Sequence, residues 1–354
     1  MSAEPPPITA EAAGNRIPGT LITGFLGSGK TTLLNALLKH EQMRDTAVIV
    51  NEFGAVGLDH LLIETAFEDA VLLKSGCICC TTRGDLVDTL GDLFERRARG
   101  AIPRFGRVVI ETTGLADPAP ILHMLMADPA VAERYRLDRV LATIDAVNAS
   151  DQLQRQYEPA KQAAIADRLV LTKTDLASSR EIDAVTTRLR ALNPTAPILR
   201  AIGGAIDPSC LFDPLEGGAP RVEMMVGTGD SHPGHPHDHA HHDHDEAEHL
   251  HGIASWSLVH REPVDWRRLA IWLEALVSLR GPDLLRLKGI VALVGRARPI
   301  VVHAVQHVLH PAIELDHWPD AEHGSRIVFI TRNIARDALE ASFRASVIEA
   351  EGIR

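Results

Sequence analysis

Residues 24–31 of the chain read Gly-Phe-Leu-Gly-Ser-Gly-Lys-Thr, which fits the pattern G-x-x-x-x-G-K-[ST]. A short apolar run precedes this stretch and a helix-forming run follows it. Glycines let backbone N–H groups converge on phosphate oxygens, and a helix N-terminus adds positive potential. We therefore expect a phosphate-binding loop, the P-loop, in which Lys30 reaches the β- and γ-phosphates and Thr31 coordinates Mg²⁺. The residues predicted to contact the nucleotide here are Gly24, Phe25, Leu26, Gly27, Ser28, Gly29, Lys30, Thr31 and Thr32.

An apolar run that ends in an acid comes later in the chain, at residues 107–111, and Gly114 follows it. This is the arrangement of a Walker B strand, with Glu111 in place of the commoner Asp. We expect Glu111 to hold Mg²⁺ directly or through water, and the Gly114 N–H to approach the γ-phosphate.

A third apolar run ends in Thr172-Lys173-Thr174-Asp175. A carboxylate at Asp175 can accept hydrogen bonds from the N1–H and the exocyclic amine of guanine, a donor pair that adenine lacks. Lys173 can lay its aliphatic stem over the base. Many GTPases have Asn where this chain has Thr172, so the stretch predicts GTP binding with one departure from the usual motif.

Three of the four cysteines, Cys77, Cys79 and Cys80, lie within four residues. One bend in an extended segment would let their thiolates converge and leave a fourth tetrahedral position for Glu52, a histidine or water. Thiolates select soft or borderline ions over Mg²⁺, so we expect a transition-metal site, with Zn²⁺ as first candidate and Co²⁺, Fe²⁺ and Ni²⁺ as alternatives. Small buried side chains or a redox-sensing disulfide would be other uses of these cysteines.

Histidines alternate with aspartates between residues 232 and 251. Neutral imidazoles on a flexible chain bind divalent transition metals loosely, so we expect an unstructured segment that supplies or buffers metal. Its auxiliary metal ligands are predicted to be His237, His239, His241, His242 and His244. Outside this segment, the spacing of His303, His307 and His310 does not place them on one face, and we expect them to be structural.

Short apolar runs alternate with amphipathic stretches between residues 17 and 206. This pattern predicts a P-loop NTPase fold, a mostly parallel α/β sheet whose ligands lie at the carboxyl ends of the strands. After a linker at 207–252, the order strand, helix, three strands, helix predicts a smaller α+β domain with its helices on one face. The predicted segments are a flexible tail (1–16), a P-loop domain (17–206), the linker with its histidines (207–252) and a C-terminal domain (253–354).

The formal net charge of −11 argues against a general nucleic-acid binder, which needs a basic surface to displace counterions. No apolar run is long enough to span a bilayer, and the N-terminus lacks the features of a secretory signal. Clustered cysteines in such a chain favour metal or redox chemistry in a reducing compartment. We therefore expect a cytoplasmic protein with no nucleic-acid and no membrane partner.

Taken together, the motifs resemble those of the CobW-type GTPases, relatives of HypB and UreG that include zinc metallochaperones. The stretches that carry the resemblance are residues 24–35, 51–54 (NEFG), 76–80 (GCICC), 111–118 (ETTGLADP), 172–175 (TKTD) and 285–289 (LRLKG). The resemblance implies GTP hydrolysis coupled to delivery of a divalent metal to a client protein. The departures are Thr172, and Leu72 with Lys74, where the family is expected to have Glu and Asn.

The sequence thus predicts a Mg²⁺-dependent GTPase, with Lys30, Thr31 and Glu111 as catalytic residues, that passes a transition metal to a client metalloprotein. Two other classes compete with this interpretation: a metal buffer or store with little GTP turnover, and a P-loop kinase acting on a small metabolite. Absence of GTP turnover would favour the store, whereas phosphate transfer to a metabolite without any effect of metal would favour the kinase. The cysteine and histidine clusters argue against the kinase.

Overall fold

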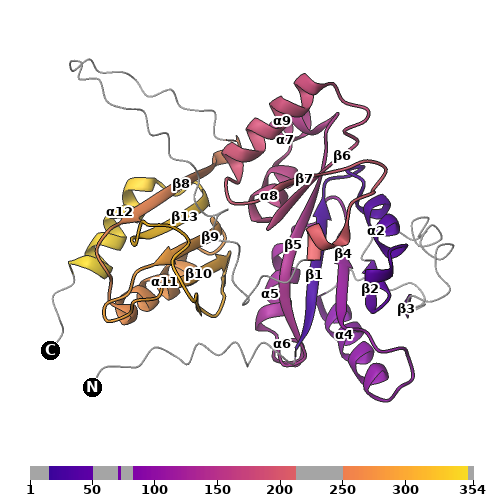
Figure 1. The fold of residues 1–354 in the computed structure, drawn as a ribbon, viewed down its shortest axis with the longest axis horizontal. Coiled ribbons are helices and arrows are strands. Elements are labelled where there is room, and N and C mark those ends of the chain that lie inside the picture. The colour runs from indigo at the N-terminus through magenta and orange to yellow at the C-terminus, as the bar shows by residue number, and fades with distance from the viewer. Residues whose placement is uncertain (1–15, 51–70, 73–82, 213–249, 350–354) are drawn as a thin grey trace.

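The computed structural model describes residues 16–50, 71–72, 83–212 and 250–349. Within these ranges the chain forms two domains, each built on its own sheet (Figure 1). The first domain is the larger, and the second, coloured orange to yellow, lies beside it.

A seven-stranded sheet with the order β3-β2-β4-β1-β5-β6-β7 forms the centre of the first domain, and its neighbouring strands all pair in parallel. The strands are β1 (Ile17–Gly24), β2 (Thr46–Val50), β3 (Val71–Leu72), β4 (Arg107–Glu111), β5 (Tyr135–Asp145), β6 (Arg168–Thr172) and β7 (Ile198–Ala201). The predicted parallel sheet of a P-loop NTPase fold is confirmed. The register places Ile22 opposite Glu111 and Asp145 opposite Thr172, so the motifs at these strand ends share one edge of the sheet.

Successive side chains of a strand point to opposite faces of the sheet, and here the residues on both faces are apolar. Helices therefore cover both faces. Leu21, for example, belongs to the core under α4, α5 and α7 to α9, whereas Ile22 belongs to the core under α2 and α10. The helices are α2 (Lys30–Leu38), α4 (Arg83–Ala98), α5 (Ala119–Ala127), α6 (Pro129–Ala132), α7 (Ala149–Arg155), α8 (Tyr157–Ile165), α9 (Ser179–Leu192) and α10 (Pro208–Phe212), with a short 3₁₀ turn η1 (Glu41–Met43).

Helix α10 lies in the segment that the sequence analysis assigned to the linker. Its Leu211 and Phe212 are nevertheless buried in the core of the first domain beside α2. Burying each of these two apolar side chains contributes about 1.5–3 kcal/mol. This burial outweighs the tendency of the surrounding Pro, Gly and Asp residues to form a loop.

The second domain is an antiparallel sheet in the order β11-β10-β9-β13-β8, with β12 beside β10. Its elements are η4 (Leu250–Gly252), β8 (Ile253–His260), α11 (Trp266–Arg280), β9 (Leu284–Val291), β10 (Ile300–Val305), β11 (Val308–Leu309), β12 (Ile313–Glu314), β13 (Ser325–Arg332), α12 (Arg336–Phe343) and a π-helical turn η5 (Arg344–Ile348). Helices α11 and α12 pack on one face, as expected for the α+β arrangement.

The other face of this second sheet packs against the first domain. Leu285 of β9 and Ile330 of β13 belong to the same hydrophobic core as helix α8, and β9 lies against α8 (Figure 1). An interface built from a shared apolar core resists the sliding that is the default between domains.

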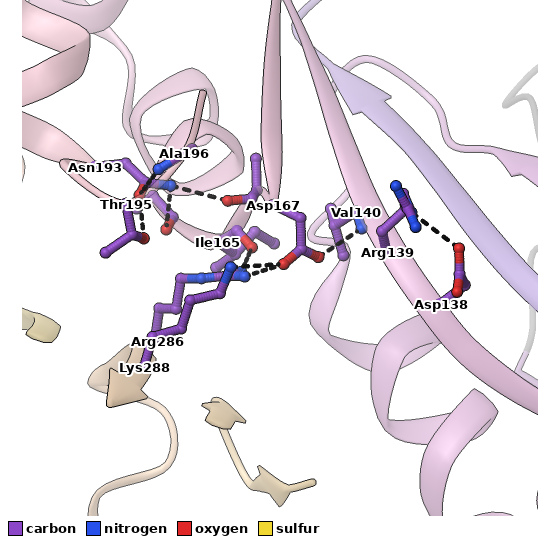
Figure 2. Close-up of polar contacts among 12 residues, drawn as sticks. Asp138, Arg139, Val140, Ile165, Asp167, Asn193, Thr195, Ala196, Arg286 and Lys288 are labelled. Atoms are coloured by element: carbon purple, nitrogen blue, oxygen red, sulfur yellow. Dashed lines mark hydrogen bonds and ion pairs between the residues drawn. The ribbon is translucent and has the colours of Figure 1, made fainter. Parts of the chain in front are cut away.

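Polar contacts add to this interface at Asp167, between α8 and β6. Figure 2 shows Arg286 and Lys288 of β9 reaching Asp167, and Arg286 also donates to the Ile165 carbonyl oxygen. Burial alone would raise the pKa of Asp167, but the two cations and the Val140 N–H hold that pKa well below its ordinary value. Asp167 is therefore ionised and fixes the second domain to the start of β6.

The prediction that His303 and His310 do not share a face is wrong. The β10–β11 hairpin reverses the chain, so that the His310 N–H donates to the His303 carbonyl oxygen at 2.9 Å and the rings stack with centroids 4.1 Å apart. Spacing along a single strand cannot show this pair, because the two histidines lie on different arms of the hairpin. Burial lowers the pKa of His310 to about 4, and it lowers the pKa of His303 as well.

Candidate functional site

The P-loop connects β1 to α2, and two glycines give it its shape. Gly24 has φ +144°, and an added Cβ there would lie 2.2 Å from Thr143 Oγ1. Gly29 has φ +90° and begins α2 without a capping side chain, which leaves the first-turn N–H groups directed at the loop. Lys30 Nζ donates to the carbonyl oxygens of Gly24 (2.9 Å) and Phe25 (3.1 Å) and thus lies across the mouth of the loop. This cradle suits phosphate groups.

Thr31 and Glu111 meet at the neighbouring strand end. The Thr31 hydroxyl donates to Glu111 Oε1 at 2.8 Å, and the Glu111 side chain is 4% exposed. A hydroxyl and a carboxylate side by side are hard oxygen donors of the kind that Mg²⁺ prefers. The donor set therefore fits the ion that the sequence analysis placed here.

The loop after β4 touches the P-loop directly. A Cβ added at Gly114 would lie 2.6 Å from the backbone nitrogen of Leu26, so only glycine allows this approach. Thr112 adds a hydrogen bond from its hydroxyl to Thr23 Oγ1 at 3.0 Å. The Gly114 backbone thus lies against the P-loop.

The end of β6 contacts the P-loop through Thr172, the residue that departs from the GTPase motif. Its hydroxyl lies 2.8 Å from the Ser28 carbonyl oxygen and 3.1 Å from that of Ile144. Its side chain also packs 3.6 Å from the Cβ position of Gly29. Thr172 therefore joins the β6 loop to the P-loop through backbone oxygens, which explains how this departure is accommodated.

Asp145 is a residue of the site that sequence reasoning missed. It is 2% exposed at the end of β5 and accepts hydrogen bonds from Lys173 Nζ (2.8 Å) and Asn148 Nδ2 (2.8 Å). Burial would raise its pKa, but these hydrogen bonds and the Lys173 charge lower it below its ordinary value. The ionised Asp145 holds Lys173, whose φ is +55°, at the turn that precedes the exposed Asp175. The sequence signal that could have identified Asp145 is an acidic residue at the end of an apolar strand, the same signal that identified Glu111.

The structure brings together the predicted nucleotide residues from the P-loop, β4 and β6 at one edge of the sheet. The predicted transition-metal ligands lie outside the described residues: Cys77, Cys79, Cys80, Glu52, His237, His239, His241, His242 and His244. Within the described ranges, no group of three or more His, Cys, Asp or Glu side chains is arranged to hold a metal ion. A helix of sufficient length and apolarity to cross a membrane is likewise absent from the part of the chain described.

Comparison with protein families places both domains. Residues 18–200 match the family described as CobW/HypB/UreG, nucleotide-binding domain. The chain belongs to this family. Residues 253–347 match the cobalamin synthesis protein cobW C-terminal domain, so the resemblance found in the sequence is confirmed over both domains.

This chain is similar to two named proteins and to one solved structure. The zinc chaperone YjiA of Escherichia coli is 35% identical over 329 residues, covering 93% of this chain and 98% of YjiA. The zinc-regulated GTPase metalloprotein activator 1 of Schizosaccharomyces pombe is 34% identical over 198 residues, which are 54% of this chain and 47% of that protein. The crystal structure of Zn(II)-bound YjiA GTPase from E. coli superposes with a TM-score of 0.69 at 31% identity, covering 94% of this chain and 99% of that one.

Proposed function

We propose that this CobW-family protein is a Mg²⁺-dependent GTPase that acts as a metallochaperone and transfers a transition metal, with Zn²⁺ as first candidate, to a client metalloprotein. The observation that carries the GTPase part is the contact between Thr31 and Glu111, 2.8 Å apart beside the Lys30 cradle. A lysine, a hydroxyl and a carboxylate in this arrangement match the requirements of a nucleoside triphosphate with its metal ion.

The chain's own residues would act on GTP mainly by positioning and by stabilising charge. Lys30 exchanges its carbonyl contacts for β- and γ-phosphate oxygens, and the α2 N-terminus adds partial positive charge. Thr31 and Glu111 would hold Mg²⁺, which when bound would neutralise charge that develops on the phosphates. The Gly114 N–H donates to the γ-phosphate. Water then displaces GDP from the γ-phosphoryl group and leaves inorganic phosphate.

Guanine selection is assigned to the loop after β6. Asp175 accepts from guanine N1–H and the exocyclic amine, while Lys173, held by Asp145, covers the base with its stem. Because Thr172 joins this loop to the P-loop, base recognition and phosphate binding share one rigid frame.

The metal cargo is assigned to Cys77, Cys79 and Cys80, with Glu52 as a fourth ligand and the histidine segment as an auxiliary trap. Similarity to a zinc chaperone and to a Zn(II)-bound GTPase supports zinc. In the sequence, residues 51–70 follow β2, whose last residue, Val50, pairs with Glu111, and residues 73–82 precede α4. This adjacency in the chain supports a two-state switch in which nucleotide and metal bias one another.

Two measurements on protein purified without a nickel column test this proposal: its metal content, and its GTP hydrolysis with and without Zn²⁺. The proposal expects bound transition metal and inorganic phosphate released from GTP, with rates that depend on Zn²⁺. Absence of turnover under every metal condition would instead indicate a metal store. Phosphate transferred to a small metabolite would indicate a kinase.

A further inference from the structure

The loop that follows the Walker B strand is held from behind by helix α8. Gln162 of α8 donates both hydrogens of its Nε2 amide, one to the Gly114 carbonyl oxygen (3.2 Å) and one to that of Ala116 (3.3 Å). The neighbouring Lys161 pairs with Asp117 Oδ2 at 2.7 Å. Two consecutive residues of one helix thus hold the backbone and a side chain of residues 114–117.

Because Gln162 is buried, its two hydrogen bonds fix the position of the loop at residues 114–117. The residue is 1% exposed, and its amide is the donor to two backbone carbonyl groups. Hydrogen bonds in such a setting are costly to break without replacement. Because the P-loop residue Leu26 lies against Gly114, and Gln162 holds the carbonyl group of the same residue, loss of the Gln162 amide should shift residue 114 and with it the Gly114 N–H.

Helix α8 also carries contacts from the second domain at each of its ends. At its start, the Tyr157 hydroxyl accepts from Arg332 Nη1 at 2.9 Å, and Arg332 is itself paired with Asp283 at 2.8 Å. At its end, the Ile165 carbonyl oxygen accepts from Arg286. Residues 159–165 are all buried, so the helix is enclosed between the first sheet and the second domain.

We propose that Gln162 is a positioning residue for GTP hydrolysis, and that α8, through Gln162 and Tyr157, makes the placement of the Gly114 loop depend on the docked C-terminal domain. The proposal rests on the GTPase function proposed above. Gln162 does not touch substrate; it acts through the Gly114 N–H, whose alignment with the γ-phosphate matters most when charge develops there.

The first test replaces Gln162 with Leu, which keeps the size of the side chain and removes the donor. We expect kcat for GTP to fall about tenfold or more, while the KM for GTP and the affinity for GDP stay within about threefold, because GDP has no γ-phosphate. Gln154→Leu is the matched control, since Gln154 is an exposed glutamine of the adjacent helix α7 and its replacement should leave all three values unchanged.

GTP hydrolysis by the natural chain tests the proposed function, and hydrolysis by the Gln162→Leu variant tests the positioning role. If the natural chain hydrolyses GTP and Gln162→Leu keeps its kcat within twofold, the positioning role is wrong; if the natural chain does not hydrolyse GTP, the proposed function itself fails. A weakening of GTP and GDP binding by the same factor would indicate a merely structural glutamine. Should the variant not fold, hydrogen exchange on the natural chain with a GTP analogue decides, and fast exchange at residues 114–117 contradicts the proposal.

The second test addresses the connection to the C-terminal domain. Tyr157→Phe removes only the hydroxyl that Arg332 contacts, and we expect kcat to change at least twofold without a matching change in GDP affinity. Tyr135→Phe is the control, because it removes a buried hydroxyl that donates to the Leu90 carbonyl oxygen at 2.9 Å, away from α8. Equal kcat values in both variants and the natural chain would contradict the proposed connection through Tyr157.

Discussion

The proposed guanine recognition depends on one carboxylate, Asp175. Asp175 lies on an exposed turn, and the lysine two residues before it is fixed by Asp145 rather than by the turn itself. The two carboxylates differ in burial. Asp145 is buried and paired with Lys173, whereas Asp175 is exposed and can accept hydrogen bonds from a ligand.

Asp175→Asn should remove most of the discrimination between GTP and ATP, because an amide cannot accept both guanine donors. A site built to hydrogen-bond its ligand loses selectivity by large factors when the partner group is lost, so we expect a loss of about 100-fold or more. Competition of GTP and ATP for a fluorescent nucleotide measures it. Asp183→Asn, an exposed carboxylate on α9, serves as the control; unchanged selectivity in Asp175→Asn would place guanine recognition elsewhere.

Cys77→Ser should lower Zn²⁺ affinity sharply while nucleotide binding stays nearly intact. A serine hydroxyl is a poor ligand for zinc compared with a thiolate, so a loss of about 100-fold or more is expected at the cysteine site. Titration against a competing chelator measures the affinity, and Cys210→Ser, an exposed cysteine in α10, is the control. The same Zn²⁺ affinity in both variants would move the site away from residues 77–80.

Helix α9 begins directly after residues 173–178, the loop proposed to bind guanine, and the helix cap lies at the end of that loop. Ser178 Oγ accepts from the Glu181 N–H at 3.3 Å, and Glu181 Oε2 accepts from the Ser178 N–H at 2.7 Å, which together form a capping box. The Glu181 carboxylate also accepts from the Ser178 hydroxyl at 2.7 Å, and this hydrogen bond, together with the one from the Ser178 N–H, lowers the pKa of Glu181.

Ser178→Ala should reduce the free energy of unfolding by about 1 kcal/mol, the usual cost of losing such a cap. Urea denaturation measures it, with the neighbouring exposed Ser179→Ala as control. The fraying first turn should also weaken GTP binding slightly. Equal stability of the two variants would show that the capping box contributes nothing.

Elements whose signals are local were predictable, and contacts between elements were not. The P-loop, the strand that ends in Glu111 and the loop at Thr172 each have all their information within about eight consecutive residues. Gln162 and Asp145 act across 48 and 28 residues of sequence, through contacts that exist only once α8 and β5 are packed. The His303 and His310 pair was missed for the same reason, because a hairpin brought the two rings together.

At the scale of the whole molecule, the two domains share a hydrophobic core with a polar cluster at its edge. The His303 and His310 rings lie near Arg286, Lys288 and Asp167, and the Nε2 atoms of both rings are buried. Such an interface favours neutral imidazoles, since burial and the nearby cations both oppose a further positive charge.

Stability should therefore fall as the pH drops from 6.5 towards 4. The pKa of His310 is about 4 in the folded chain against 6.5 ordinarily, so the unfolded chain binds more protons in this window. The contribution of neutral His310 to the free energy of unfolding is complete above pH 6.5. Acidification from pH 7 to pH 5 reduces it by about 2 kcal/mol. Urea denaturation at both pH values measures it. His310→Gln should reduce this loss and the exposed His317→Gln should not; equal pH dependence in both would contradict the assignment.

We expect phosphate chemistry at Lys30 and metal binding at the cysteines to be coupled, and linkage makes this coupling measurable from the metal side. The most direct measurement is a Zn²⁺ titration of the protein bound to a GTP analogue, bound to GDP and without nucleotide, repeated with Cys77→Ser to separate the histidine segment. We predict that the affinities in the GTP-analogue and GDP states differ about fivefold or more, and that the difference disappears in the variant. Equal Zn²⁺ affinities in all three states of the natural chain would contradict the account.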